Sequence, residues 1–322
     1  MRETGRILVA TYPFGEANAQ PRGLLDASPH EIIYNPRGRR LKAGEVEKLL
    51  PQMDAVVAGT EPYPVALLDK CPNLKVIARV GIGLDNVDVR ACRERGIQVT
   101  YTPDAPSQAV AELTLGFIIC LVRNVHQSDR SVREQAWNRL MGCLLEEITI
   151  GIIGVGRIGS RVVRLLEPFG CRRLLHDVAP VPSRVEGCDV EWVERDALLQ
   201  QADLVSIHIP LTAKNRHFIG RTEIKMMKRG AFLVNTSRGP VVDEAALTEA
   251  LEWGHLAGAG LDVFEREPYE GPLALLDQTL LTAHMGASAR KSRYLMELGA
   301  AEDCLRVLAG EAPANPAILD DD

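Results

Sequence analysis

Three residues whose side chains can hold a carboxylate or move a proton stand just after successive apolar, strand-like runs in the second half of the sequence. They are Arg238, Glu267 and His284. Ligands of open α/β sheets bind at the carboxyl ends of the strands, so side chains that follow parallel strands meet at one edge. We therefore expect an arginine, a glutamate and a histidine to converge there.

These residue types suit hydride transfer to a 2-keto acid. The forked guanidinium of Arg238 can hold the carboxylate and polarise the ketone, which the point charge of a lysine does less well. An imidazole titrates near neutral pH, so His284 can give a proton to the nascent alkoxide, while Glu267 can fix the tautomer of the ring. Taken singly, each residue type is commonly structural. Their order behind a dinucleotide-binding loop is what favours chemistry.

That loop lies at the end of an apolar, β-branched run. The stretch Ile148–Gly159 reads I-T-I-G-I-I-G-V-G-R-I-G and leads into a helix-like segment. Gly154 allows a tight turn, Gly156 lets the backbone approach a pyrophosphate, and Gly159 packs helix on strand. The phosphates would lie at the helix N-terminus, where unpaired N–H groups attract anions.

A carboxylate follows at the distance that a dinucleotide site requires. Asp177 ends the next short apolar run, roughly 20 residues after the first glycine. A carboxylate there binds the ribose hydroxyls and repels a 2′-phosphate, and no Arg or Lys follows immediately to reverse that preference. The sequence therefore predicts NAD, in its reduced form NADH, rather than NADP as the cofactor.

Short apolar runs alternate with helix-compatible segments along the whole sequence, which predicts an α/β fold with parallel sheets covered by helices. The strands predicted before the glycine loop are Ile7–Ala10, Ile32–Tyr34, Ala55–Ala58, Val76–Ala78 and Gln98–Thr100. Those predicted after it are Leu174–His176, Leu204–Ile209, Phe232–Asn235, Gly258–Leu261 and Leu280–Ala283. We therefore expect two αβα domains.

The domain boundary is predicted at T-P-D-A-P-S, Thr102–Ser107, where two prolines precede a long apolar helix over Ala109–Val122. The last helix-like stretch, Ala289–Leu308, follows the second domain and could return to the first. We expect a discontinuous substrate domain over residues 1–102 and 289–322, and an NAD-binding domain over residues 103–288.

The composition is that of a globular protein. The 322 residues are 46% hydrophobic with a formal net charge of −6 and no long basic run, which argues against nucleic acid as a partner. The seven cysteines are scattered without a C-x-x-C pair, so we expect reduced thiols and predict no metal site. The N-terminal apolar segment is too short for a signal peptide and no run could span a bilayer, which leads us to expect a cytoplasmic protein without membrane contact.

The motifs resemble those of one family in the same order. The sequence contains G-V-G-R-I-G, S-I-H-I-P-L-T, L-V-N-T-S-R-G-P-V-V-D-E, G-L-D-V-F-E-R-E-P and T-A-H-M-G-A. It thereby resembles the D-isomer-specific 2-hydroxyacid dehydrogenases, and R-V-G-I-G-L-D-N-V-D and A-E-L-T-L-G-F-I-I-C-L-V-R extend the resemblance to the phosphoglycerate-dehydrogenase-like members. The match covers roughly Ala55–Ala287.

This resemblance implies a Rossmann domain inserted into a flavodoxin-like substrate domain, and an NAD-dependent oxidoreductase that interconverts a small D-2-hydroxy acid and its 2-keto acid. It makes Arg238, Glu267 and His284 the catalytic residues. The cofactor-binding residues would be Gly154, Gly156, Arg157, Ile158, Gly159, Asp177, His208, Pro210, Thr236, Ser237, Asp262, Gly286 and Ala287. The substrate carboxylate would bind to backbone N–H groups of a loop that includes Arg79, Val80, Gly81 and Ile82.

The resemblance also assigns finer roles. His208 and Pro210 would line the adenosine side, with a structural role as the alternative for His208, and Asp262 would hold the nicotinamide amide. The apolar helix Ala109–Val122 and the chain up to Trp137 resemble the dimerisation region of the family, so we predict a homodimer.

The sequence departs from the family at the expected phosphate site. Many phosphoglycerate dehydrogenases carry an arginine near the end of the third strand, where this chain has Ala58, and Glu61 nearby would repel a phosphate. The chain also stops soon after Leu308, which leaves no room for a C-terminal regulatory domain. Phosphoglycerate is therefore not the expected substrate, and no charge pattern in the predicted pocket segments, Gly59–Tyr63 and Trp137–Leu145, names one acid.

Other functions on the same fold stay open. Formate dehydrogenases pair their histidine with a glutamine, where this chain has Glu267, and phosphite dehydrogenases place a lysine where Ile82 stands. A regulator that senses NADH without turnover, similar to a corepressor, would keep the same motifs. Turnover of 2-keto acids is the observation that separates these classes.

Overall fold

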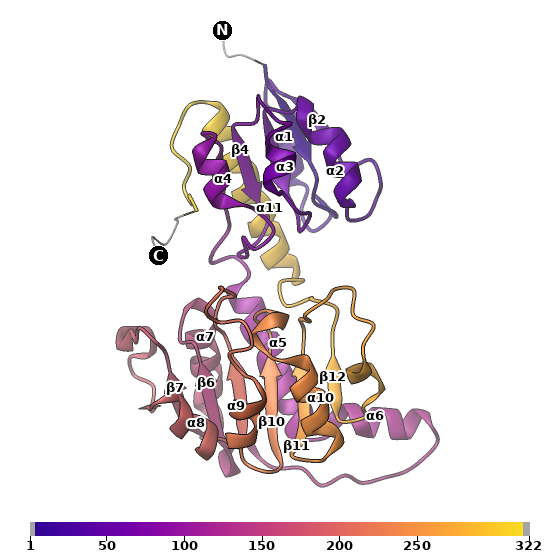
Figure 1. Cartoon of the computed structure of the whole chain (residues 1–322), viewed down its shortest axis with the longest axis vertical. Coiled ribbons are helices and arrows are strands. Elements are labelled where there is room, and N and C mark those ends of the chain that lie inside the picture. The colour runs from indigo at the N-terminus through magenta and orange to yellow at the C-terminus, as the bar shows by residue number, and fades with distance from the viewer. Residues whose placement is uncertain (1–3, 318–322) are drawn as a thin grey trace. The chain divides into compact units, whose positions relative to one another are not determined.

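The computed structural model describes residues 4–317, which form two compact units. The first unit comprises Met1–Pro106 and Ala287–Asp322, and the second comprises Ser107–Gly286. These limits lie within a few residues of the predicted domain boundaries, and Figure 1 shows the sheet and helices of each unit.

The first unit contains a five-stranded parallel sheet in the order β2-β1-β3-β4-β5. This is the flavodoxin-like order that the resemblance implies. Its strands are β1 (Arg6–Val9), β2 (Glu31–Tyr34), β3 (Ala55–Ala58), β4 (Val76–Arg79) and β5 (Gln98–Thr100). Its helices are α1 (Gln20–Asp26), α2 (Ala43–Leu49), α3 (Val65–Leu68), α4 (Val89–Glu94) and α11 (Arg290–Leu308).

The C-terminal helix α11 belongs to the first unit because it covers one face of this sheet. Met296, Ala300 and Cys304 of α11 are buried with Leu25 of α1 against strand residues such as Val57. Helices α2, α3 and α4 cover the other face, where alternate strand residues point. The discontinuous first domain is therefore built on a sheet that depends on both ends of the chain.

The second unit contains a seven-stranded parallel sheet in the order β12-β11-β10-β9-β6-β7-β8. Its first six strands follow the Rossmann order and β12 extends one edge, which confirms the predicted α/β fold class. The strands are β6 (Thr149–Ile153), β7 (Arg172–His176), β8 (Glu191–Trp192), β9 (Leu204–Ile207), β10 (Ala231–Asn235), β11 (Leu256–Leu261) and β12 (Thr279–Leu281). The helices are α5 (Ser107–Val122), α6 (Val125–Arg133), α7 (Arg157–Leu166), α8 (Arg195–Gln201), α9 (Arg221–Met226) and α10 (Glu244–Glu252).

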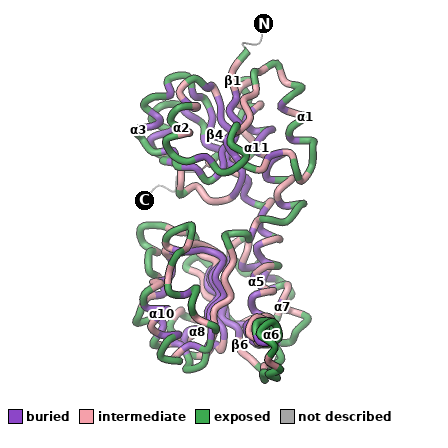
Figure 2. Tube along the Cα trace, turned by 90° about the vertical axis from the view of Figure 1, so that its right-hand side faces the viewer, coloured by how far each residue is buried: buried purple, intermediate pink, exposed green. Residues whose placement is uncertain are grey.

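Helices α5 and α7 cover one face of the second sheet, and α8, α9 and α10 cover the other. Figure 2 shows the buried strands between these helix layers. No single helix of residues 4–317 is long and apolar enough to cross a membrane; α5 and α6 meet that criterion only together, with a bend of 65° between them.

Two predicted strands of the second unit end earlier in the structure, and one short strand was not predicted. β9 ends at Ile207, not Ile209, so His208 follows the strand. β12 ends at Leu281, not Ala283, because the chain then turns: His284 N donates to Thr282 O (3.1 Å) as well as to Asp262 O (2.8 Å). The two-residue strand β8 was not predicted, since Glu191 and Trp192 form no apolar run.

The contact of α5 with β11 depends on a glycine, Gly260, which has no side chain. Phe117 of α5 is only 2% exposed, and its ring lies over Gly260, where an added Cβ would approach it to 3.2 Å. A helix that is apolar on most sides can pack here because glycine leaves room for the aromatic ring.

We expect Phe117→Ala to lower the free energy of unfolding by about 3 to 5 kcal/mol, because the lost ring leaves a cavity over Gly260. Urea unfolding followed by circular dichroism measures this change. Val178→Ala is the control, since Val178 is 90% exposed and its loss should leave the transition unchanged. Equal transitions for both variants would contradict the packing described here.

Candidate active site

The glycine turn after β6 is shaped by close backbone contacts. Gly154 has φ +89°, and an added Cβ would lie 2.8 Å from the backbone carbonyl carbon of His208. An added Cβ on Gly159 would lie 2.0 Å from the carbonyl oxygen of Gly154, whereas one on Gly156 would meet no heavy atom within 4 Å. Gly154 and Gly159 therefore serve the fold, and Gly156 keeps open space at the N-terminus of α7, as a pyrophosphate requires.

Asp177 lies beside this turn, directly after β7. Its Oδ2 accepts a hydrogen bond from Val155 N at 2.7 Å, and its Oδ1 accepts one from Ala179 N at 2.9 Å. Each carboxylate oxygen has a second lone pair, so both can still accept a ribose hydroxyl. The position fits an NAD site, in which this carboxylate excludes a 2′-phosphate.

His208 follows β9 and packs against the glycine turn. Its Nε2 lies 2.9 Å from Ser206 Oγ, and its buried Nδ1 has no hydrogen-bond partner among the described residues. Burial lowers the pKa of His208 to about 3, so the ring is neutral at neutral pH. His208 therefore packs against the turn and presents a neutral ring nitrogen. It has no positive charge with which to bind a phosphate of the cofactor.

Asn235 organises the chain at the end of β10. This buried side chain accepts hydrogen bonds from Ser237 N (3.0 Å) and Ser237 Oγ (2.8 Å), and its Nδ2 donates to Arg238 O at 2.9 Å. Thr236 Oγ1 lies 2.9 Å from Thr114 Oγ1 of α5. The Arg238 guanidinium donates to Ser237 O at 2.7 Å, so the turn is held by its own residues together with Thr114 of α5.

Asp262 has a comparable role after β11, where it is 1% exposed. Its carboxylate accepts hydrogen bonds from Thr282 Oγ1 (2.5 Å), Met285 N (2.7 Å) and Gly286 N (2.8 Å). These bonds hold the 282–286 turn, in which His284 has φ +49°. Few residues other than glycine adopt this left-handed conformation, although histidine does so more often than most. The bonds to the buried aspartate hold the turn and so fix the orientation of the predicted acid.

His284 and Glu267 form the central contact of the site. Glu267 Oε2 lies 2.8 Å from His284 Nδ1, and the side chains are 31% and 42% exposed. Burial raises the pKa of Glu267, but the hydrogen bond and charge of His284, the N–H of Phe264 and the charge of Arg238 outweigh it and lower that pKa. The second unit thus brings the three predicted catalytic residues within electrostatic reach of one another.

The remaining predicted cofactor residues lie on neighbouring segments. Arg157 and Ile158 open α7, Pro210 follows β9, and Gly286 is the last residue of the second unit. Ala287 is the first residue of the returning segment of the first unit.

The predicted substrate loop belongs to the first unit and begins at the end of β4. The N–H of Val80 donates to Ala58 O at 2.9 Å, and the N–H of Gly81 donates to Thr102 Oγ1 at 2.9 Å. The buried Arg79 guanidinium donates to the carbonyl of Val80. The N–H groups of Val80 and Gly81 thus already have acceptors within the protein. That of Ile82 makes no backbone hydrogen bond within residues 4–317.

The loop after β3 differs from what the charge of Glu61 suggests. Glu61 is fully buried, and its Oε2 accepts a hydrogen bond from Gly59 N at 2.8 Å, so the carboxylate is turned into the protein. Burial and the charge of Glu61 raise the pKa of Tyr63, and Arg79 lowers it. Exposed Arg40 also reaches this loop, where its Nη2 donates to Thr60 O at 2.5 Å, a contact that no sequence pattern indicated.

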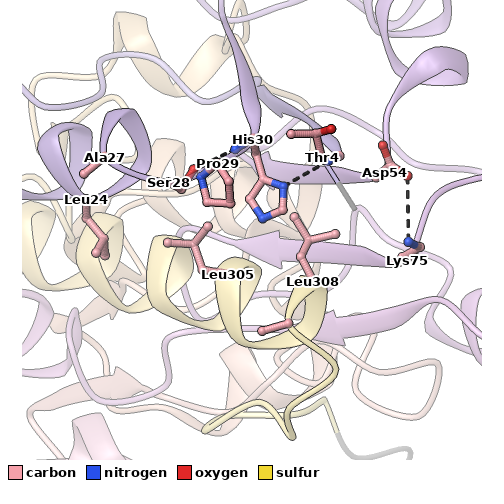
Figure 3. Close-up of a pocket in the computed structure, with 12 residues that line it drawn as sticks. Thr4, Leu24, Ala27, Ser28, Pro29, His30, Asp54, Lys75, Leu305 and Leu308 are labelled. Atoms are coloured by element: carbon pink, nitrogen blue, oxygen red, sulfur yellow. Dashed lines mark hydrogen bonds and ion pairs between the residues drawn. The ribbon is translucent and has the colours of Figure 1, made fainter. Parts of the chain in front are cut away.

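A cavity of about 720 Å³ lies at the amino ends of the strands of the first sheet, beside α11 (Figure 3). Its polar groups serve the starts of strands: His30 Nδ1 accepts from Gly5 N at 3.0 Å, and Asp54 Oδ2 accepts from Arg6 N at 2.8 Å. Ligands of open α/β sheets bind at the carboxyl ends of strands, whereas these residues precede their strands. This cavity is therefore not the candidate site.

Substitutions of two glycines distinguish a role in cofactor binding, expected for Gly156, from a role in the stability of the fold, expected for Gly159. We expect Gly156→Ala to keep the thermal stability of the protein while weakening NADH binding by about tenfold or more, because its methyl group takes up the space left for the pyrophosphate. Gly159→Ala should lower the unfolding temperature instead, since its Cβ meets the Gly154 carbonyl. Fluorescence titration with NADH and thermal unfolding distinguish the two outcomes, and unchanged NADH affinity of Gly156→Ala would refute the cradle.

Residues 115–286 match the family model described as D-isomer specific 2-hydroxyacid dehydrogenase, NAD binding domain. The chain is 38% identical over 264 residues to a glyoxylate reductase of Korarchaeum cryptofilum, covering 80% of each protein. It is 42% identical over 253 residues to a D-3-phosphoglycerate dehydrogenase of Methanocaldococcus jannaschii, covering 77% of this chain but only 48% of that longer protein.

The solved structures agree with these relatives. The crystal structure of a D-lactate dehydrogenase of Aquifex aeolicus, complexed with NAD and lactic acid, superposes with a TM-score of 0.86 at 27% identity. It covers 98% of this chain, and this chain covers all of it. With its Rossmann-ordered sheet, its glycine turn and the matched NAD-binding domain, the chain belongs to the D-isomer-specific 2-hydroxyacid dehydrogenases, an NAD-dependent family, and is similar to their phosphoglycerate-dehydrogenase-like members.

Proposed function

We propose that this chain interconverts a small D-2-hydroxy acid and its 2-keto acid, with His284 as acid and base, Glu267 as its partner and Arg238 as the binder of the substrate carboxylate and carbonyl. The contact of 2.8 Å between His284 and Glu267 at the carboxyl edge of the second sheet carries this proposal. A histidine held by a carboxylate beside an arginine is the arrangement that proton transfer to a developing alkoxide requires.

We assign each side chain a step that this geometry supports. The bond to Glu267 engages Nδ1 of His284, which leaves Nε2 to exchange the proton with the substrate oxygen. When the carbonyl oxygen gains negative charge, the guanidinium of Arg238 stabilises it. NADH, when bound, supplies the hydride that reduces the carbonyl carbon.

A small substrate without a phosphate fits the first unit. Ala58 is fully buried at the end of β3, where many phosphoglycerate dehydrogenases have an arginine. The carboxylate of Glu61 is turned into the protein and does not meet the substrate, so Ala58 is the residue that disfavours a phosphate. We therefore favour a 2-keto acid such as glyoxylate, the acid in the name of the Korarchaeum cryptofilum relative.

The alternatives within the fold have less support. A formate dehydrogenase would carry a glutamine in place of Glu267, and the charge of Glu267 is engaged by His284 here. A phosphite dehydrogenase would carry a lysine in place of Ile82. An NADH-sensing regulator keeps these side chains without turnover, so a purified protein that binds NADH but oxidises it with no 2-keto acid would favour the regulator.

We expect His284→Ala to reduce kcat for glyoxylate reduction by about 10² to 10⁴-fold while NADH affinity stays unchanged, because the variant lacks the proton donor but keeps the glycine turn. Stopped-flow absorbance of NADH and fluorescence titration measure the two quantities. His30→Ala, at the amino end of β2, is the control. Near-normal turnover of His284→Ala would disprove the assignment.

We also propose a homodimer in the cytoplasm. Apolar side chains on α6 and the segment after it are strongly exposed, with Val132 at 52%, Trp137 at 78%, Met141 at 93% and Leu144 at 54%. Large apolar side chains exposed close together in the sequence favour a protein interface over isolated surface positions. The free state of all seven cysteines supports a reducing compartment.

Light scattering is expected to give about twice the chain mass for the native protein. The double variant Trp137→Glu with Met141→Glu should halve that mass, because charges at the centre of an apolar interface oppose association. Leu275→Glu is the control, since Leu275 is 83% exposed and lies on a different segment. A native mass near that of one chain would contradict the dimer.

A further inference from the structure

The loop that carries Glu267 contains a second carboxylate, Glu265, which contacts two other segments. Glu265 Oε1 lies 2.9 Å from His217 Nε2, and its Oε2 lies 3.6 Å from Arg216 Nη2. The side chain is 27% exposed, although its E-R-E-P setting suggests a solvated residue. Glu265 therefore ties its loop to the segment between β9 and α9.

Glu265 also exchanges hydrogen bonds with Glu244, the first residue of α10. The N–H of Glu244 donates to Glu265 Oε1 at 3.3 Å, and the N–H of Glu265 donates to Glu244 Oε1. Burial of the Glu244 side chain, together with the charges of Glu265 and Glu267, raises the pKa of Glu244 despite that backbone hydrogen bond. Two like charges are thus kept close together by backbone donors.

These contacts involve the two segments that present the catalytic residues. Glu244 lies a few residues after Arg238, and Glu265 lies two residues before Glu267. The backbones touch between them, because an added Cβ on Gly239 would lie 1.8 Å from the carbonyl carbon of Phe264. The N–H of Phe264 in turn donates to Glu267 Oε1 at 3.2 Å.

We propose that Glu265, seated by Glu244, is a positioning residue that holds the loop from Phe264 to Glu267 so that the Glu267 carboxylate reaches His284. The inference rests on the proposed role of the Glu267 and His284 pair. It adds that the contact of Glu267 with His284 depends on the two hydrogen bonds between Glu244 and Glu265. Neither Glu244 nor Glu265 is assigned contact with the substrate.

The physical argument is that an exposed loop holds a side chain accurately only when its own backbone is fixed. Glu267 is 31% exposed and makes its contact with His284 at the protein surface. A misplacement of about 1 Å in such a group can cost on the order of 100-fold in rate. The reciprocal hydrogen bonds between Glu244 and Glu265 restrain the loop backbone next to Phe264, the residue that contacts Gly239.

The test uses the full-length protein with ¹⁵N-labelled histidine. At about pH 8, where ordinary imidazoles are neutral, ¹⁵N shifts report which ring nitrogen carries the proton. We expect native His284 to carry it on Nδ1, toward Glu267, and Glu267→Ala to lose this signature. Glu265→Ala should move the His284 shifts most of the way toward those of Glu267→Ala, and His284→Ala identifies the resonances.

Kinetics provide the second readout. Glu265→Ala should lower kcat for glyoxylate about tenfold or more with NADH affinity unchanged, and Glu265→Gln should restore most of it, because the amide oxygen still accepts the Glu244 N–H. Glu249→Gln is the matched control. Glu249 lies on α10, the helix that begins with Glu244, but it pairs with Arg221 and not with this loop. If Glu265→Ala does not fold, Glu244→Ala removes the other bond of the pair, from the N–H of Glu265 to Glu244 Oε1, and tests the same restraint.

The outcomes separate this inference from the proposed function. Native-like His284 shifts in folded Glu265→Ala or Glu244→Ala overturn the positioning role, whatever the turnover of the native protein. Displaced shifts support it, and they do so even if the native protein reduces no 2-keto acid, a result that would overturn only the proposed function.

Discussion

Close approach of backbone to backbone is the constraint on which the catalytic half of the molecule depends. At Gly154, Gly159 and Gly239 an added Cβ would lie 1.8 to 2.8 Å from a neighbouring main-chain atom. Gly154 and Gly239 lie on the chain that leaves the carboxyl edge of the second sheet, and Gly159 lies in the first turn of α7, which follows the Gly154 turn. Because no side chain separates the loops, polar groups on different loops come within hydrogen-bond distance, and the site can be built from short contacts.

Buried or half-buried carboxylates then fix what the glycines allow to meet. Asp177 binds the N–H of Val155 beside the cofactor turn, and Asp262 binds the turn that orients His284. Glu267 completes the pattern with a bond to the imidazole itself. In each case a negative side chain accepts main-chain or ring N–H groups at a loop, where charged acceptors form stronger hydrogen bonds than neutral ones.

The sequence predicted the features that arise from local pattern. Alternating apolar runs predicted the parallel sheets, the glycine turn predicted the cofactor cradle, and the position of Arg238, Glu267 and His284 after strands predicted their convergence, because parallel strands end at one edge. The sequence did not predict the pairing of Glu265 with Glu244 or the contact of Arg40 with Thr60. Those contacts join loops whose paths are set by tertiary packing, and a glutamate in a polar loop reads the same whether it is solvated or engaged. The predicted ends of β9 and β12 were two residues too late. For β12 the reason is again a tertiary contact, because Asp262 holds the turn that follows the strand.

The return of α11 to the first sheet has a consequence for how the chain is made. During synthesis the strands of the first unit emerge early, but the helix that buries Met296, Ala300 and Cys304 against them comes near the end. The second unit is continuous along the chain and can complete its core while one face of the first sheet still lacks its cover. The first unit is therefore completed only after the second, and for that interval its apolar face is open to aggregation or to chaperones.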